Sequence, residues 1–208
     1  MSEDLSEARK ELARGLDAHR EVSERVVEAV RSVPRHEFAP EETGVEAYRD
    51  RPLPIGEGQT MSAPHMVAVM CGRLDLDPGE EVLEIGAGCG YHAAVTAELV
   101  GAGNVYTVEY SADLAQLARE NLAAAGYGDV SVRQGDGRNG WSEHAPYDAA
   151  YLTCATQDFP EDVVAQVREG GRLLAPLGNG VQRLVFAHKT GDGLQRQPQG
   201  PVRFVRMR

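Results

Sequence analysis

A short apolar run that ends in alternating glycines, E-V-L-E-I-G-A-G-C-G-Y, occupies residues 81–91. The run before the first glycine predicts a buried parallel strand, and the alanine-rich stretch at 92–100 predicts the helix that follows. Gly86, Gly88 and Gly90 fall in the turn between them, where a backbone without Cβ atoms adopts positive φ and lets a ligand come close. This pattern predicts a nucleotide-type binding loop, and a plain turn without a ligand is the alternative.

The residues around the glycines indicate which ligand the loop takes. The spacing is G-x-G-x-G and not the G-x-G-x-x-G of dinucleotide-binding loops. Glu84 lies in the strand just before the loop, where its charge would repel a pyrophosphate and favour a ligand with cationic groups. S-adenosylmethionine has a sulfonium, an ammonium and no phosphate. We therefore expect this cofactor, and an NAD-linked oxidoreductase is the disfavoured alternative.

The length of 208 residues suits one sizeable α/β domain. Within this single domain, 1–208, we expect an N-terminal helical and substrate-side segment, 1–78, and a cofactor-binding core with C-terminal strands, 79–208. No apolar run approaches the roughly 20 residues of a membrane span. The acidic N-terminus lacks the basic and apolar regions of a signal peptide. We expect a cytoplasmic, monomeric protein with no membrane partner.

Cysteine and histidine spacing gives no sign of a metal site. Cys71, Cys89 and Cys154 are widely spaced and form no C-x-x-C pair, and the six histidines include no H-E-x-x-H motif. The sequence therefore predicts no bound metal and no disulfide framework.

The charge balance points to a salt-rich environment. The net charge is −11, from 32 acidic residues against 21 basic ones, and only Lys10 and Lys189 are lysines. At molar salt the Debye length shortens to about 3 Å, so that self-repulsion no longer matters. We therefore predict a halophilic source. No nucleic-acid partner is expected, although negative charge alone does not exclude one at such salt.

The N-terminal third reads as helices followed by an irregular stretch. Leucines and valines at helical spacing predict helices at 3–18 and 20–33, and prolines interrupt any periodicity across 35–58.

A polar segment then precedes a third helix, expected from Ala63 or Pro64 to about Leu74. Ser62 fits the N-cap of this helix, and capping alone is the alternative to a functional role. The free N–H groups at a helix start also favour a carboxylate.

Strands and helices alternate through the rest of the chain, and a Gly-Asp-Gly turn at 191–193 predicts a terminal hairpin. This order gives a mixed α/β sheet with ligand sites at the carboxyl ends of the strands. The predicted strands are 104–109, 129–133, 147–153 and 172–176; the predicted helices are one capped by Ser111 that runs towards Gly126 and one at 160–167; a turn is predicted at 170–171.

Two acidic residues follow predicted strands. Glu109 is the last residue of the predicted strand at 104–109, where an acidic side chain would accept hydrogen bonds from ribose hydroxyls. The alternative is that it only opens the next helix. Asp136 lies in the polar turn after the third strand and could accept a hydrogen bond from an adenine amino group. A plain turn aspartate is the alternative there.

Taken together, these segments strongly resemble the protein-L-isoaspartate (D-aspartate) O-methyltransferase family. The glycine loop is shared with class I methyltransferases in general, whereas the segment G-Q-T-M-S-A-P-H at 58–65 is specific to this family. About five-sixths of the chain is covered. The matching stretches are 33–35, 51–56, 58–66, 82–91, 135–137, 145–148, 170–173 and 182–184.

The resemblance implies a class I methyltransferase fold, a Rossmann-like doubly wound mixed sheet with added N-terminal helices and C-terminal antiparallel strands. It implies S-adenosylmethionine as methyl donor and isoaspartyl-containing proteins and peptides as acceptors. It also implies that Ser62 is the active-site serine and that Thr60 and His65 lie near the substrate. The implied cofactor-binding residues are Gln59, Thr60, Glu84, Gly86, Gly88, Glu109, Gly135, Asp136 and Gln182.

The chemistry of methyl esterification suits these residue types. A substrate carboxylate with a pKa of about 4 is already ionised at neutral pH, so no general base is needed. What remains is to aim the carboxylate, so we expect Ser62 to act as an orienting donor and not as a covalent nucleophile. The alternatives are a class I methyltransferase that acts on RNA or a small molecule, and a cofactor-binding protein without activity.

Overall fold

The fold comes from a computed structural model that describes residues 2–16 and 21–208. The ends of the two predicted N-terminal helices at 17, 18 and 20 lie outside these residues. In chain order the elements are α1 (Ser2–Leu16), α2 (Glu24–Ser32), η1 (Arg35–Phe38), η2 (Glu41–Tyr48), β1 (Leu53–Gly56), β2 (Gln59–Met61), α3 (Pro64–Leu74), β3 (Val82–Ile85), α4 (Tyr91–Val100), η3 (Ala102–Asn104), β4 (Val105–Glu109), α5 (Ala112–Ala124), β5 (Ser131–Gln134), η4 (Gly137–Asn139), η5 (Ser142–His144), β6 (Tyr147–Leu152), α6 (Glu161–Gln166), β7 (Val167–Leu177), β8 (Gln182–Thr190) and β9 (Gly193–Val202).

A seven-stranded mixed sheet in the order β5-β4-β3-β6-β7-β8-β9 forms the centre of the fold. Neighbours from β5 to β7 are parallel, β8 is antiparallel to β7, and β9 is antiparallel to β8. The chain moves outward from β3 to β4 and β5 and then returns to the other side of β3 as β6. The strand order therefore reverses between β3 and β6, where the carboxyl ends of the strands leave a crevice for a ligand.

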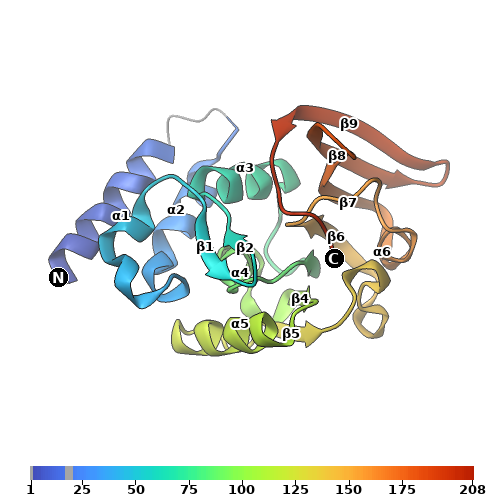
Figure 1. The fold of residues 1–208 in the computed structure, drawn as a ribbon. Helices are drawn as coiled ribbons and strands as arrows, with labels where there is room; N and C mark the ends of the chain where they lie inside the picture. Colours follow the sequence, from blue (N-terminus) through green and yellow to red (C-terminus); the bar gives the residue numbers. More distant parts are fainter. Residues whose placement is uncertain (1, 17–20) are drawn as a thin grey trace.

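The sheet has an apolar core on each face because successive side chains of a buried strand point to opposite sides. Val82 of β3 belongs to a large core that includes α1, α2, α3 and α4, and Leu83 and Ile85 belong to a second core that includes α6. Figure 1 shows α1 and α2 at one end of the molecule and β8 and β9 at the other. The C-terminal end returns to the middle, near β6 (Figure 1).

Most of the predicted elements are confirmed. The strand before the glycines, the helix after them, the third helix and the terminal hairpin all form, and the Ser111 hydroxyl caps α5 by accepting a hydrogen bond from the Leu114 N–H at 3.4 Å. The second helix is shorter than predicted, because it begins at Glu24 with Ser23 as its cap. In the described part of the chain, no helix combines the length and the hydrophobicity that crossing a bilayer requires.

Two predictions about local structure are wrong. Residues 53–61, predicted to be partly irregular, form the β1–β2 hairpin, with Glu57 and Gly58 at φ 53° and 68° in its turn. Two prolines obscure this hairpin in the sequence, although an edge strand tolerates proline. The predicted turn at 170–171 is a bulge inside β7, where the pairing with β6 shifts register.

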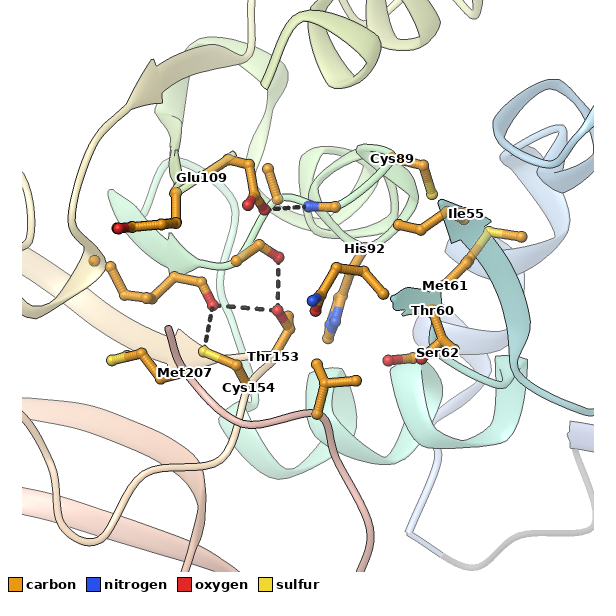
Figure 2. A pocket seen from close by; sticks show the side chains of 18 of the residues that line it. Ile55, Thr60, Met61, Ser62, Cys89, His92, Glu109, Thr153, Cys154 and Met207 are labelled. Atoms are coloured by element: carbon orange, nitrogen blue, oxygen red, sulfur yellow. Dashed lines mark hydrogen bonds between the residues drawn. The ribbon is translucent and has the colours of Figure 1, made fainter. Parts of the chain in front are cut away.

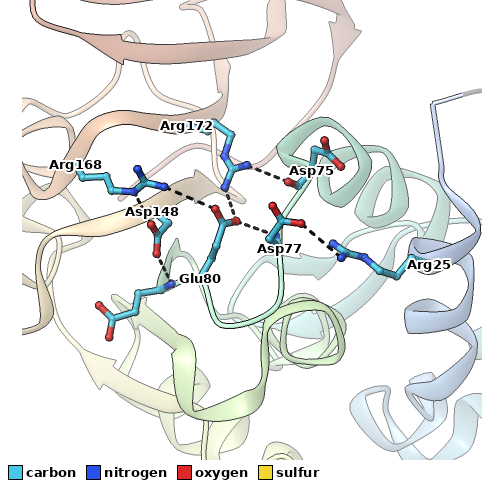
Figure 3. A network of polar contacts seen from close by, with 8 residues as sticks. Arg25, Asp75, Asp77, Glu80, Asp148, Arg168 and Arg172 are labelled. Atoms are coloured by element: carbon cyan, nitrogen blue, oxygen red, sulfur yellow. Dashed lines mark hydrogen bonds and ion pairs between the residues drawn. The ribbon is translucent and has the colours of Figure 1, made fainter.

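A polar network ties the loop between α3 and β3 to the sheet (Figure 3). Arg172 of β7 donates to the Asp75 carbonyl at 2.9 Å and forms an ion pair with Glu80, whose side chain is 14% exposed. Asp148, at the start of β6, accepts from the Glu81 N–H at 2.7 Å and pairs with Arg168 at 2.5 Å. This network lies at the amino ends of the parallel strands, away from the crevice, so it supports stability and not ligand binding.

We predict that Arg172→Met lowers the free energy of unfolding by about 1–3 kcal/mol, because it removes the donor of the Asp75 carbonyl and the nearer of the two arginines that pair with the mostly buried Glu80 carboxylate. Chemical denaturation measures this change. Arg31→Met is the control, since its pair with Glu28 is half exposed on both sides and should be worth less than about 0.5 kcal/mol. Equal losses in the two variants would contradict a special role for Arg172.

Candidate active site

The glycine loop follows β3 in a conformation that requires glycine. Gly86, Gly88 and Gly90 have φ of 100°, 56° and 91°. A Cβ on Gly86 would lie 2.3 Å from the Thr153 hydroxyl oxygen, and that hydroxyl donates to the Gly86 carbonyl at 2.6 Å. The loop is therefore fixed against the end of β6, and its backbone is left open towards a ligand.

A solvent-connected cavity of about 810 Å³ lies in front of this loop, and we call it the cofactor cavity. Its walls come from 59–62, 85–89, 108–110, 153–154 and 205–208. Figure 2 shows Glu109 on one side of it and Thr60 and Ser62 on the opposite side. The cavity lies where the strand order reverses, as expected for a ligand site of a doubly wound sheet.

Glu109 presents a carboxylate to the cofactor cavity at the end of β4. Its Oε2 accepts from the Gly88 N–H at 2.9 Å, and its Oε1 accepts from the Ser111 N–H at 3.0 Å. Because the loop N–H already faces this anion, a pyrophosphate placed there would be repelled. The carboxylate keeps lone pairs for hydroxyl donors such as those of a ribose.

Glu84 is not part of the cavity wall, so the electrostatic role expected for it needs correction. Its side chain is fully buried and accepts hydrogen bonds from the Thr107 hydroxyl at 2.5 Å and the Tyr151 hydroxyl at 3.0 Å. Burial raises the pKa of Glu84 to about 8, so the group is mostly neutral at pH 7. It joins β3 to β4 and β6, and Glu109 is the acidic side chain at the cavity.

His92 gives the cavity a neutral wall. Its ring lies 4.5 Å from the Tyr151 ring, centroid to centroid, and burial lowers its pKa to about 3. An imidazole that stays neutral at pH 7 adds no positive charge beside a cationic ligand.

Three other predicted cofactor residues lie outside the cavity wall. Gly135 and Asp136 precede Gly137, which does line it, and the Asp136 carboxylate accepts from the Arg138 N–H at 2.9 Å. Gln182 is buried and bonds Phe204 twice, at 3.0 and 2.6 Å. Gln182 thus anchors the C-terminal segment that closes the cavity.

A second cavity of about 630 Å³ adjoins the first, and we call it the acceptor cavity. Thr60, Ser62 and Thr153 line both cavities. His65 lines the acceptor cavity alone, and its ring Nδ1 lies 2.8 Å from the Asp50 Oδ1. The structure therefore brings the predicted substrate residues together and sets three hydroxyls on the boundary between two cavities.

Ser62 does not cap α3, contrary to the prediction. The helix begins at Pro64 with Ala63 as its cap residue, which makes no side-chain hydrogen bond to the helix start. Proline at this position has no N–H to satisfy, and the next N–H, that of His65, donates to the Asp50 carboxylate at 2.9 Å, so a capping hydroxyl is not needed. The Ser62 carbonyl accepts from the buried Arg35 guanidinium at 2.8 Å, which leaves the hydroxyl available to the cavities.

The sequence did not indicate several residues of the cavity walls. Thr153 directly follows β6, the strand next to β3, so its place at the reversal of strand order was the available signal. The C-terminal segment 205–208 had none, because it reaches the cavity through tertiary contacts: Arg208 pairs with Glu57 of the β1–β2 turn at 3.5 Å. Within the described residues, no three His, Cys, Asp or Glu side chains converge as a metal site would need.

The residues present fit S-adenosylmethionine. Glycines leave room at the loop, Glu109 supplies hydroxyl acceptors, and the half-exposed ring of Tyr110 lies at the cavity wall. The mixed sheet with this loop and this cavity defines a class I methyltransferase.

Comparison with known proteins identifies the particular family. The family model described as protein-L-isoaspartate(D-aspartate) O-methyltransferase matches residues 7–208. Protein-L-isoaspartate O-methyltransferase 2 of Archaeoglobus fulgidus is 50% identical over 99% of this chain and 94% of its own length. A Methanothrix thermoacetophila enzyme with the name protein-L-isoaspartate O-methyltransferase is 55% identical over 82% of both chains. The chain belongs to the protein-L-isoaspartate (D-aspartate) O-methyltransferase family.

Solved structures agree with this fold. A protein-L-isoaspartate O-methyltransferase superposes with a TM-score of 0.87 at 31% identity, over 95% of this chain and 65% of the other. A putative family member from Plasmodium falciparum, in complex with S-adenosyl-L-homocysteine, gives a TM-score of 0.85 at 24% identity over 96% and 98% of the two chains.

We predict that Glu84→Gln changes how stability depends on pH. An unfolded glutamate releases its proton near pH 4.5 and folded Glu84 near 8, so the folded wild type holds one more proton between these values. Its stability relative to E84Q should therefore fall by up to about 1.4 kcal/mol per pH unit from pH 4.5 to 8 and then level off. Chemical denaturation of both proteins from pH 5 to 9 measures the difference.

The His92 contribution cancels in this comparison, because both proteins keep that residue. A stability difference that stays constant from pH 5 to 9 would show that Glu84 is ionised in the folded protein.

Proposed function

We propose that this protein uses S-adenosylmethionine to methylate the free carboxylate of L-isoaspartyl residues in damaged proteins and peptides. The resulting ester closes to a succinimide without the enzyme, and hydrolysis returns part of it to normal aspartate, so the reaction starts repair. Membership of the family supports this activity. The structural observation that carries it is the pair of cavities that share Thr60, Ser62 and Thr153.

The cofactor cavity suits the methyl donor through a few contacts. S-adenosylmethionine, when bound, supplies a methyl group activated by its sulfonium. We assign the ribose hydroxyls to Glu109 and the close backbone approach to Gly86 and Gly88. Gln59 and Thr60 line the cavity on its other side. In place of the cofactor contacts first expected, we assign an anchoring role to Gln182 and a bridging role to Glu84.

The acceptor cavity suits an anionic peptide whose carboxylate needs to be oriented but not deprotonated. Ser62 and Thr60 line both cavities, and we assign their hydroxyls to the carboxylate that faces the methyl group. A hydroxyl donor orients the attacking oxygen, and in-line approach at about 3–3.5 Å is the main requirement. His65 is held by Asp50, and we assign it to the wall that shapes the peptide site.

The test of this function is methyl transfer from labelled S-adenosylmethionine to paired peptides that differ only in isoaspartyl or aspartyl linkage. Label on the isoaspartyl peptide alone supports the proposal. Label on neither peptide, with cofactor binding intact, would redirect the search to RNA and small-molecule acceptors.

We predict that Ser62→Ala lowers kcat about 10- to 100-fold and leaves cofactor affinity unchanged, because the hydroxyl aims the acceptor and the backbone position is set by Arg35. Ser142→Ala, a change of the same size outside both cavities, should leave kcat unaltered. An unchanged kcat in S62A would remove Ser62 from the mechanism.

We further propose that the enzyme works as a monomer in the cytoplasm of a halophile, without a nucleic-acid partner. The net charge of −11 and the near absence of lysine support the halophilic part. Many of its ion pairs join half-exposed side chains, such as Arg49 with Glu46 and Arg133 with Glu143. Pairs of this kind add little stability, so excess negative charge dominates the salt response.

We predict that the melting temperature rises from 0.1 M to several molar KCl, because screening removes self-repulsion among the acidic residues. A parallel series in sucrose controls for solute exclusion from the protein surface. A melting temperature that stays level or falls in KCl would contradict adaptation to salt.

A further inference from the structure

The acceptor cavity is lined by an arginine whose side chain has no partner among the described residues. Arg203 lines this cavity together with Ser62 and His65. Among the described arginines, only Arg183 and Arg203 form no side-chain hydrogen bond, ion pair or ring contact, while the side chains of the others bond carboxylates or carbonyls. An acid-rich surface offers many partners to a guanidinium, so an unpaired one beside a binding cavity needs an explanation.

The other charged groups of this region are already engaged. The Asp50 carboxylate lies 2.8 Å from the ring Nδ1 of His65 and accepts from the His65 backbone N–H at 2.9 Å. Arg206 and Arg208, further along the same segment, line the cofactor cavity and bond the Asn179 and Glu57 carbonyls. Arg203 is therefore the cation that the acceptor cavity can offer to a negatively charged ligand.

We propose that Arg203 binds a carboxylate of the acceptor peptide; this inference rests on the proposed function. The guanidinium presents parallel N–H donors that match the two oxygens of a carboxylate. The carboxylate is either the reacting one of the isoaspartyl residue or that of an acidic neighbour in the peptide. In both cases Arg203 offsets the repulsion that a protein of net charge −11 exerts on an anionic substrate.

The reaction itself determines which kinetic constant Arg203 affects. Esterification removes the negative charge of the reacting carboxylate, so attraction of that group to Arg203 weakens towards the transition state and is absent in the neutral ester. A carboxylate of an acidic neighbour keeps its charge, so its attraction to Arg203 is the same in the bound substrate and in the transition state. In both cases the interaction lowers KM without raising kcat. Arg203 thereby differs from Ser62, whose loss affects kcat.

The test compares the wild type with Arg203→Gln, Arg203→Lys and Arg183→Gln in low salt. Arg203→Gln should raise KM for an isoaspartyl peptide by about three- to tenfold, the range of an exposed ion pair with good geometry. The kcat and the KM for S-adenosylmethionine should stay within about twofold. Arg203→Lys should recover part of the loss, and Arg183→Gln, which changes the net charge equally outside both cavities, should have no effect.

Two isoaspartyl peptides with a neutral or an acidic neighbour distinguish the two carboxylates. An equal rise in KM on both assigns Arg203 to the reacting carboxylate, and a rise only with the acidic peptide assigns it to the neighbour. Calorimetric binding of each peptide in the presence of S-adenosyl-L-homocysteine should show the same loss of affinity.

An unchanged KM in Arg203→Gln, or an equal rise in Arg183→Gln, would overturn the inference and leave the proposed function standing. Absence of methyl transfer by the wild type to either isoaspartyl peptide would overturn the proposed function, and the role of Arg203 with it.

Discussion

A buried arginine sets the position of the segment on which the whole site depends. Arg35 is fully buried, and its guanidinium donates to the carbonyls of Ala47 and Ser62, each at 2.8 Å. It also lies 4.5 Å above the ring of Tyr91, the first residue of the helix after the glycine loop. A buried cation tolerates few arrangements of its hydrogen-bond acceptors. Arg35 therefore fixes the backbone of Ser62 relative to the glycine loop.

Glu84 fixes the positions of the central strands, as Arg35 fixes the position of the segment that carries Ser62. A protonated carboxyl group bridges three parallel strands through Thr107 and Tyr151, and the Tyr151 hydroxyl lies 2.9 Å from that of Thr96 on α4. The network holds β3, β4 and β6 in register just below the loop. Because burial raises the pKa of this acid, it provides hydrogen bonds without bringing a second negative charge close to Glu109.

The parts of the fold that depend on local pattern were predictable, and those that depend on pairing across the chain were not. The strand-turn-helix at 82–100 follows from hydrophobic periodicity and glycine spacing. The β1–β2 hairpin was missed because two prolines conceal an edge strand, and the bulge at Gly170 is set by register with β6. Glu84 was identified as important from its place before the glycines, but its ionisation depends on burial, which no local pattern gives.

The distribution of charge over the two cavities matches the chemistry between them. Glu109 lies at the far side of the cofactor cavity and Arg203 lines the acceptor cavity, while the shared boundary is formed by the hydroxyls of Thr60, Ser62 and Thr153 and by the apolar Val205. Transfer of a methyl group from a sulfonium to a carboxylate turns two charged reactants into two neutral products, so charge decreases towards the transition state. A boundary that solvated those charges strongly would stabilise the reactants more than the transition state. Hydroxyl donors hold the carboxylate in place with less of this penalty, which explains why a serine and not a lysine or arginine lies at the centre of the site.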